Sequence, residues 1–386
     1  ENIQYTDVLV AGGGAAGVAA AVAASRSGLK VTLLERNAFL GGKATAAEVG
    51  TVCGLHEHNL TGKTEYAVKG FAKEFAEILK KNSGTEALYN NDGLHYLPYD
   101  TTVFKDTCTR MLSQNHVHVL MNTELCKVII NNKQIEAVTV AGNNLLTQIN
   151  IKAVVDCSGD AAISSAAKLT TLKSETYQAA AQVFYIQNIA EENEPRLGMI
   201  LMKALRKAID ENKLPTNADR LYIIPGSLKN NCVGLKAGIP LDVTDEPGNL
   251  EALRESAVGF IHELTRFLVS EVPVFRNASL LHIAPEVGTR VGARTTGKYI
   301  LTADDVLTCR KFDDAIANGT WPIEEWAQHK RVNMRFLKPG DHYQVPARCL
   351  QSDHIENLFM AGRNISATDE AIASARVMGT CLQTGY

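Results

Sequence analysis

The first 35 residues of this 386-residue chain constrain its fold more than any other segment. Residues 5–11 form a short apolar run with β-branched members, which is typical of a buried parallel strand. The run leads directly into a glycine-rich turn, Gly12-Gly13-Gly14-Ala15-Ala16-Gly17, and then into an alanine-rich segment that predicts a helix ending before Gly28. A second strand is predicted over residues 30–34, and Glu35 follows it. This order of elements predicts a β-α-β unit of a doubly wound α/β sheet.

The residue types in this unit suit the binding of a dinucleotide. Gly12 permits the tight turn, Gly14 lets the backbone approach a pyrophosphate, and Gly17 allows the helix to pack closely on the sheet. The start of the helix offers free backbone N–H groups and a partial positive charge to phosphates. Glu35 lies 23 residues after Gly12, where a carboxylate can accept hydrogen bonds from both ribose hydroxyls of an adenosine.

Three further segments narrow the choice of dinucleotide. Gly41-Gly42-Lys43-Ala44-Thr45 follows Glu35 sooner than the next helix and strand of a plain NAD-binding fold would allow. A strand predicted over residues 153–157 ends in Ser158-Gly159-Asp160, where Asp160 is placed to cap the next helix. Near the C-terminus, a predicted strand ends in Gly362-Arg363, and a helix is expected from Ala371 onward with Ser366 or Thr368 as its cap.

Together these motifs resemble the FAD-dependent oxidoreductase family, the two-dinucleotide-binding-domain flavoproteins related to the flavoprotein subunits of fumarate reductase and heterodisulfide reductase. The longest stretches that are similar to this family begin at "LLHIAPEVGTRVGARTTGKYILTADDV" and at "YQVPARCLQSDHIENLFMAGRNISATDEAIASARVMGTC". The resemblance implies FAD as the cofactor and a Rossmann-like FAD-binding domain of the glutathione-reductase type. The FAD contacts that it implies fall on Gly12, Gly14, Ala15, Ala16, Gly17, Glu35, Arg36, Gly42, Lys43, Ala44, Thr45, Leu125, Ser158, Gly159, Asp160, Gly362, Arg363, Asp369 and Ala371.

The remaining patterns predict a second domain inserted into the FAD-binding domain. The first part of the FAD-binding domain is expected over residues 1–170 and its returning part over 331–386. Four short strands between residues 117 and 151 are expected to form a β-meander before the strand over 153–157. Residues 171–330 carry two predicted amphipathic helices, over 195–212 and 251–269, and are expected to form an α+β substrate or cap domain.

Candidate catalytic residues come from three places. Arg290 and Arg294 lie four residues apart, on one helix face or flanking one turn, and their guanidinium groups suit a carboxylate-bearing substrate; interdomain or surface ion pairs are the alternative. His56 follows the Gly41–Thr45 turn and can serve in acid–base chemistry or attach covalently to the flavin, or it lies with His58 on an exposed strand. The other candidate proton donors are His342 and Tyr343.

The amino-acid composition limits the kinds of binding partner that we expect. The 39 Lys and Arg residues do not exceed the 42 Asp and Glu residues, so nothing indicates nucleic acid, and no apolar run approaches the ~20 residues of a membrane span. Eight cysteines without a CxxC motif favour reduced thiols in the cytoplasm and no metal site. The chain begins at Glu1, so removal of an N-terminal leader stays open, and a homo-oligomer is one possible assembly.

The predicted function is that of an FAD-dependent dehydrogenase or reductase. It would move a hydride between flavin N5 and a small organic substrate, with a separate electron acceptor or donor. The substrate is expected between the domains, against a face closed by residues 281–300 and 342–350. The alternatives are a non-redox protein with structural FAD, such as thiazole-synthase relatives or a sensor, and electron transfer to a thiol or protein partner.

Overall fold

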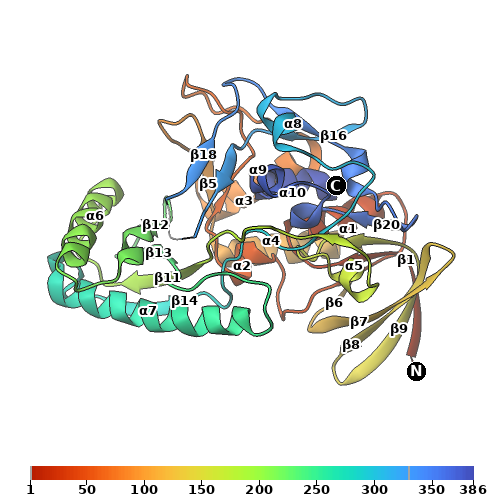
Figure 1. Cartoon of the computed structure of the whole chain (residues 1–386), viewed down its shortest axis with the longest axis horizontal. Helices are drawn as coiled ribbons and strands as arrows, with labels where there is room; N and C mark the ends of the chain where they lie inside the picture. The colour runs from red at the N-terminus through yellow and green to blue at the C-terminus, as the bar shows by residue number, and fades with distance from the viewer. Residues whose placement is uncertain (1, 329–330) are drawn as a thin grey trace.

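A computed structural model describes residues 2–328 and 331–386. Its largest sheet has seven strands in the order β6-β2-β1-β9-β8-β7, and β20 pairs with β9 outside this path. These strands are β1 (Asn2–Ala11), β2 (Val31–Leu34), β6 (His118–Leu120), β7 (Thr123–Asn131), β8 (Gln134–Gly142), β9 (Leu145–Asp156) and β20 (Leu358–Met360). The fold is therefore the predicted mixed α/β fold around a Rossmann-like sheet, which lies near the N-terminus at one end of the molecule (Figure 1).

Two strand predictions were wrong in their pairing. The segment at 118–120, expected to open the meander, is β6, and it pairs parallel with β2 as part of the nucleotide-binding half of the sheet. The strands expected over 145–151 and 153–157 are one continuous strand, β9, which pairs antiparallel with β8 and parallel with both β1 and β20. Turn signals at the strand ends do not report which neighbour a strand pairs with, because that choice depends on contacts distant in sequence.

Helices cover one face of this sheet and bury the largest hydrophobic cluster. They are α1 (Ala15–Arg26), α3 (Gly70–Ser83), α4 (Thr101–Gln114) and α10 (Met378–Gly385). The small residues of α1 allow α10 very close, since a Cβ on Gly385 would lie 2.1 Å from the carbonyl oxygen of Ala16. The helix expected to run on from Ala371 instead ends as α9 (Asp369–Ala375), and the extended backbone of Val377 redirects the chain into α10. Of the two expected caps for α9, Thr368 is the one that accepts the hydrogen bond, from the amide of Ala371.

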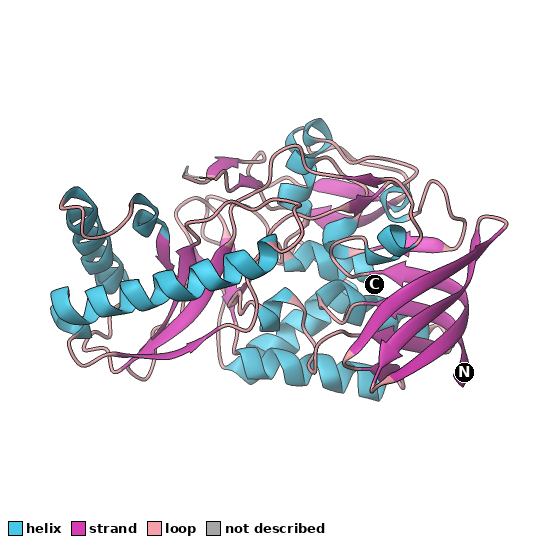
Figure 2. Cartoon of the chain, turned by 60° about the horizontal axis from the view of Figure 1, so that its bottom comes forward, coloured by secondary structure: helices cyan, strands magenta, loops and turns pink. Residues whose placement is uncertain are grey.

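A second layer extends from the seven-stranded sheet, and it lies at the left of Figure 1. Its antiparallel sheet has the order β12-β13-β11-β14 and packs against two amphipathic helices around a separate core. The strands are β11 (Ala181–Gln187), β12 (Leu221–Ile223), β13 (Cys232–Gly238) and β14 (Ser279–Ile283), and the helices are α6 (Glu194–Asp210) and α7 (Asn249–Glu271). Figure 2 shows the long helix α7 crossing one face of these strands.

Smaller elements join the two layers. They are β3 (Thr51–Val52), β4 (Leu88–Tyr89) and β5 (His95–Pro98), the pairs β10 (Thr171–Leu172) with β15 (Arg294–Thr295), β16 (Ala315–Gly319) with β19 (Tyr343–Pro346) and β17 (Ile323–Glu325) with β18 (Asn333–Arg335), and the helices α2 (Lys43–Ala46), α5 (Ala162–Ala166) and α8 (Ala303–Leu307). The expected domain boundary after residue 330 falls on residues 329–330, which lie outside the described residues. None of the helices in the two described ranges is long and apolar enough to cross a bilayer.

Candidate cofactor and substrate site

The glycine-rich turn between β1 and α1 forms one end of a large cavity. Gly12 has a φ of +104°, and a Cβ there would lie 2.6 Å from the carbonyl oxygen of Cys157. A Cβ on Gly17 would lie 1.8 Å from the carbonyl oxygen of Gly12, so this position requires glycine for α1 to reach the sheet. Helix α1 begins without a side-chain cap and without an acidic residue in its first turn. Its free amides and dipole therefore face the cavity at Gly14 and Ala15, as an anion such as a pyrophosphate requires.

Glu35 ends β2 beside this turn and is 5% exposed. Its Oε2 accepts a hydrogen bond from the amide of Gly13 at 2.8 Å, and its Oε1 accepts one from the amide of Asn37 at 2.8 Å. Burial raises the pKa of the Glu35 carboxyl, although these two amides act in the opposite direction. Each oxygen keeps a second acceptor position, so the carboxylate can also receive two ribose hydroxyls.

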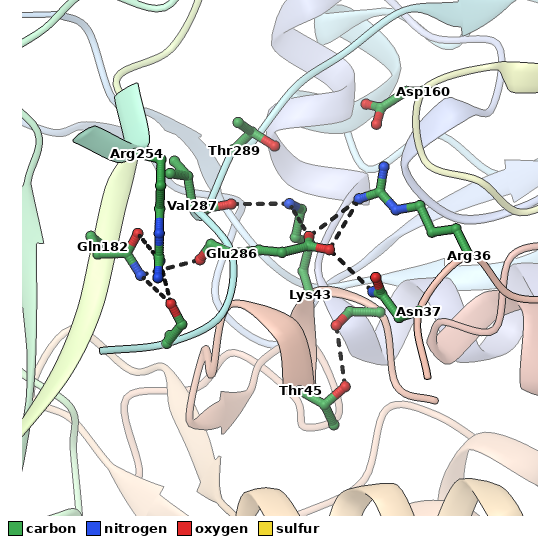
Figure 3. Close-up of polar contacts among 12 residues, drawn as sticks. Arg36, Asn37, Lys43, Thr45, Asp160, Gln182, Arg254, Glu286, Val287 and Thr289 are labelled. Atoms are coloured by element: carbon green, nitrogen blue, oxygen red, sulfur yellow. Dashed lines mark hydrogen bonds and ion pairs between the residues drawn. The ribbon is translucent and has the colours of Figure 1, made fainter. Parts of the chain in front are cut away.

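A charged network joins the two layers over the cavity, and Figure 3 shows it centred on Glu286. The Glu286 carboxylate accepts hydrogen bonds from Lys43 Nζ at 2.8 Å, from a terminal nitrogen of Arg36 at 3.2 Å and from Asn37 Nδ2 at 3.1 Å. Burial lowers the pKa of Lys43, whereas the pKa of Glu286 lies below its usual range because Lys43 and Arg36 outweigh the effect of its own burial. Glu286 was not named as a site residue, although it lies in the 281–300 segment that was expected to close the substrate space. Its contact with Lys43 could not be predicted, because the two residues lie 243 positions apart in sequence.

The two later motifs meet because β20 pairs in parallel with β9. Gly159 has a φ of +83°, and a Cβ there would lie 2.5 Å from a guanidinium nitrogen of Arg363. Arg363 also forms an ion pair with Asp160 at 3.6 Å and donates to the carbonyl of Thr289 at 3.2 Å. Asp160 was expected to cap α5, and this prediction was wrong. That helix begins instead on the Ser158 hydroxyl, which accepts from the amide of Ala162 at 2.9 Å.

The cavity has a volume of ≈ 1260 Å³. Pockets for one drug-sized ligand are typically about 300–1,000 Å³, so there is room for a dinucleotide and a smaller molecule. Most of the residues implied as FAD contacts line it, namely Gly12, Gly14, Ala15, Ala16, Glu35, Arg36, Gly42, Lys43, Ala44, Leu125, Ser158, Gly159, Asp160, Gly362 and Arg363. Gly17, Thr45, Asp369 and Ala371 lie outside the lining. Thr45 supports it from behind, since its hydroxyl donates to the carbonyl of Leu40 at 2.6 Å.

The structure separates the two candidate arginines. No helix spans them. Arg290 lies in the loop after β14 and lines the cavity, with its guanidinium carbon 4.4 Å from the centre of the Trp326 ring. Arg294 begins β15, and its side chain is 2% exposed and paired with Asp369 at 2.5 Å. It also donates to the carbonyls of Ala367 and Gly292 at 2.8 and 2.9 Å. Arg294 thus holds buried structure together, whereas Arg290 can reach a ligand.

The other candidate catalytic residues lie outside the cavity lining. His56 is buried rather than on an exposed strand, with ring centroids 4.7 Å from Tyr66 and 5.2 Å from His95. Burial lowers the pKa of His56 to about 4, and the charge of His95 acts in the same direction.

Residues 342–350, expected to close the substrate space, do not contribute to the lining either. Tyr343 is fully buried and shares a hydrogen bond of 2.8 Å with Ser374, and burial raises the pKa of its hydroxyl. The carbonyl of His342 accepts a hydrogen bond from Lys311.

The far end of the cavity carries polar and aromatic residues that the sequence did not point to. They are Tyr96, Tyr222, Lys236, Trp321, Glu324, Trp326 and Arg376. These residues come from β5, β12, β13, the segment around β17 and the end of α9, so only the assembled layers bring them together. Apart from Trp321, Glu324 and Trp326, these residues lie too far apart in the sequence for a spacing pattern to link them.

Comparison with known proteins gives one family and a set of distant structures. The sequence model of the family described as "FAD dependent oxidoreductase" matches residues 7–386. No curated protein matches the chain. One similar solved structure is that of a geranylgeranyl bacteriochlorophyll reductase-like protein from Thermoplasma acidophilum. It has 14% identity and a TM-score of 0.47, and the match covers 98% of this chain and 77% of that chain.

Two further solved structures are similar at the same level. L-proline dehydrogenase from P. horikoshii has 13% identity over 98% of this chain and 91% of that chain, with a TM-score of 0.45. The anhydrotetracycline hydroxylase OxyS from Streptomyces rimosus has 10% identity and a TM-score of 0.47, and the match covers 77% of this chain and 55% of the hydroxylase.

Proposed function

Because the chain belongs to the FAD dependent oxidoreductase family, we propose that it transfers a hydride between flavin N5 and a small organic substrate that carries a carboxylate. When bound, FAD supplies the two-electron donor or acceptor. The observation that carries the proposal is the position of Arg290: its guanidinium shares one cavity with the glycine-rich turn and Glu35.

The residues at the first end fit the cofactor. Glu35 would receive the ribose hydroxyls of the adenosine, and the start of α1 would receive the pyrophosphate. Gly12 and Gly159 are required by the turns that line this end of the cavity, because a Cβ at either position would clash with the Cys157 carbonyl or with Arg363. Lys43 and Arg363, which also line this cavity, would add positive charge beside the phosphates.

Arg290 would hold and orient the substrate. A guanidinium presents donors in a planar fork that matches a carboxylate. One of its nitrogens already donates to the carbonyl of Ala179, and its face lies over Trp326, so the group is positioned before a ligand arrives. Trp321 and Trp326 cover this end of the cavity with apolar surface and limit the access of water to the reacting atoms.

Thiol chemistry is the less favoured alternative. Cys53, Cys157 and Cys381 line the cavity, but burial raises the pKa of each thiol, to about 12 for Cys53 and Cys381. A reactive cysteine requires the opposite shift, because the thiolate is the nucleophile.

The proposal is tested by anaerobic reduction of the bound flavin. The visible flavin absorbance of the FAD-loaded protein should bleach on addition of a suitable 2-hydroxy or 2-amino acid and not on addition of the corresponding amide. Arg290→Gln should abolish this bleaching while FAD stays bound. Arg276→Gln, which changes an exposed arginine outside the cavity lining, is the matched control and should behave as wild type. A flavin that only dithionite reduces would contradict the proposal and favour a structural cofactor.

A further inference from the structure

The far end of the cavity concentrates positive charge. Lys236 on β13, Arg290 after β14 and Arg376 at the end of α9 face one carboxylate, Glu324 on β17. We name these four residues the cationic pocket. Three cations opposed by one anion leave two positive charges without a partner in the described part of the chain.

Glu324 already has three side-chain neighbours on its carboxylate. Its two oxygens accept hydrogen bonds from the indole nitrogens of Trp321 and Trp326, both at 2.9 Å, and one of them lies 3.5 Å from a terminal nitrogen of Arg376. Burial acts to raise the pKa of Glu324, but Arg376 and its other neighbours lower this pKa by more. The Glu324 carboxyl is therefore ionised at neutral pH. Glu324 therefore holds Arg376 and the two indoles in place. Its single negative charge also acts on Lys236 and Arg290, but one carboxylate leaves the three cations with a net positive charge.

Lys236 is the cation with the fewest partners. Its ammonium group forms no hydrogen bond or ion pair with any residue in 2–328 or 331–386, and it lies 5.0 Å from the Trp326 ring centre and 5.7 Å from that of Tyr222. Burial, together with Arg290, lowers the pKa of Lys236 to about 8. The aromatic faces attract the cation but carry no net charge.

The two arginines also keep free donors. The guanidinium of Arg290 donates to one backbone carbonyl and faces Trp326, and no carboxylate lies within ion-pair distance of it among the described residues. The Nε of Arg376 is buried without a hydrogen-bond partner. Arg220, 7% exposed, borders a small void of ≈ 10 Å³ with Lys236 and Arg290 and adds another positive charge. Buried charges of one sign are costly unless an opposite charge joins them.

We propose that the cationic pocket binds an organic dianion, either a dicarboxylate or a phosphate monoester, with a planar or apolar body. Lys236, Arg290 and Arg376 would hold the two negative charges. The body of the ligand would lie against Trp326, Tyr222, Trp321 and Tyr96, which form the apolar walls. The inference rests on the proposed function only for the role of this ligand as substrate; binding itself requires no redox step.

Binding of four small aromatic probes to the FAD-loaded full chain tests this inference. Calorimetric titrations would use phthalate with two carboxylates, phenyl phosphate with one phosphate, benzoate with one carboxylate and neutral benzamide. We expect at least one dianion to bind about tenfold or more tightly than benzoate, because it meets two additional donors, and benzamide not to bind. The better of phthalate and phenyl phosphate identifies carboxylate or phosphate as the chemistry that the pocket selects.

Variants place the binding in the cationic pocket. Lys236→Met should weaken the binding of the dianion by about tenfold and the binding of benzoate by less. Lys229→Met, at an exposed lysine in the segment just before β13, should change neither. A second variant, Lys236→Gln, covers the case in which the methionine variant does not fold.

Equal affinities for benzoate and both dianions, or unchanged affinities in both Lys236 variants, would overturn the inference. Dianion binding without flavin reduction by any carboxylic acid would leave the pocket standing and refute the hydride transfer. Flavin reduction by a monocarboxylate, together with no preference for dianions in the titrations, would refute the dianion site and leave the hydride transfer standing.

Discussion

Replacing Arg294 with methionine tests whether this arginine stabilises the fold rather than binds a ligand. The guanidinium donates to the carbonyls of Ala367 and Gly292 and to Asp369 Oδ1, at 2.8, 2.9 and 2.5 Å. Methionine fills part of the same volume but removes all of these bonds. Arg294 does not line the cavity, so we expect a loss of stability and no change in binding there.

The magnitude follows from burial. Removing one member of a buried ion pair costs about 3–5 kcal/mol. The Asp369 side chain is 31% exposed and can regain water, so we expect the low end, about 3 kcal/mol. At roughly 2.1 cal/mol/K per residue, a chain of 386 residues has an unfolding entropy of about 0.8 kcal/mol/K, so Tm should fall by about 4 °C.

The assay combines thermal unfolding of the FAD-loaded protein with titration of phthalate. Asp369→Asn and the double variant complete a cycle, in which we expect a coupling of about 1–2 kcal/mol between the two side chains. A Tm within about 1 °C of wild type would refute the stability argument. A loss of phthalate binding at unchanged Tm would show that Arg294, like Arg290, acts on the ligand.

Three other predictions follow from single contacts. Gly17→Ala should prevent the soluble folded protein from forming, because its Cβ would lie 1.8 Å from the carbonyl oxygen of Gly12; expression and circular dichroism measure this. Gly28→Ala is the control, since no atom lies within 4 Å of its Cβ. With a φ of +83° at this position, it should lower the free energy of unfolding by only about 1 kcal/mol. Glu35→Gln should weaken FAD about tenfold in a fluorescence titration of the apoprotein, because the amide turns one acceptor into a donor; unchanged affinity would remove Glu35 from the ribose site. His56 has a pKa of about 4 in the fold but takes up a proton near pH 6.5 when the chain is unfolded. The free energy of unfolding should therefore fall by up to about 3 kcal/mol as the pH drops from 6.5 to 4. Urea midpoints measured across this pH range should fall less in the His56→Asn variant than in wild type.

The cofactor end could be predicted because its chemistry is local in sequence. The strand, the turn, α1, β2 and Glu35 all lie within 35 residues, and each has a recognisable residue pattern. The later motifs at Gly159 and Gly362 were also recognisable, since each follows a strand directly. Their meeting across the cavity required the parallel pairing of β9 with β20.

Spacing was a poor guide to which candidate catalytic residues line the cavity. Arg290 and Arg294 are equivalent in the sequence, yet one lies over Trp326 in the cavity and the other is buried against Asp369. Likewise the position of His56 after the Gly41–Thr45 turn says nothing about its ring's neighbours, Tyr66 and His95, which bury it away from the lining.

The sequence by itself determined the nucleotide-binding unit, the family and hence the cofactor, because backbone geometry at glycine turns and helix starts depends on neighbouring residues. Only the tertiary structure decided where charge collects. Glu286 reaches Lys43, and Lys236 lines one cavity with Glu324 and Arg376, because separate layers pack against one another. The electrostatics of a site depend on distance and burial in space, and neither is encoded in the separation of residues along the chain.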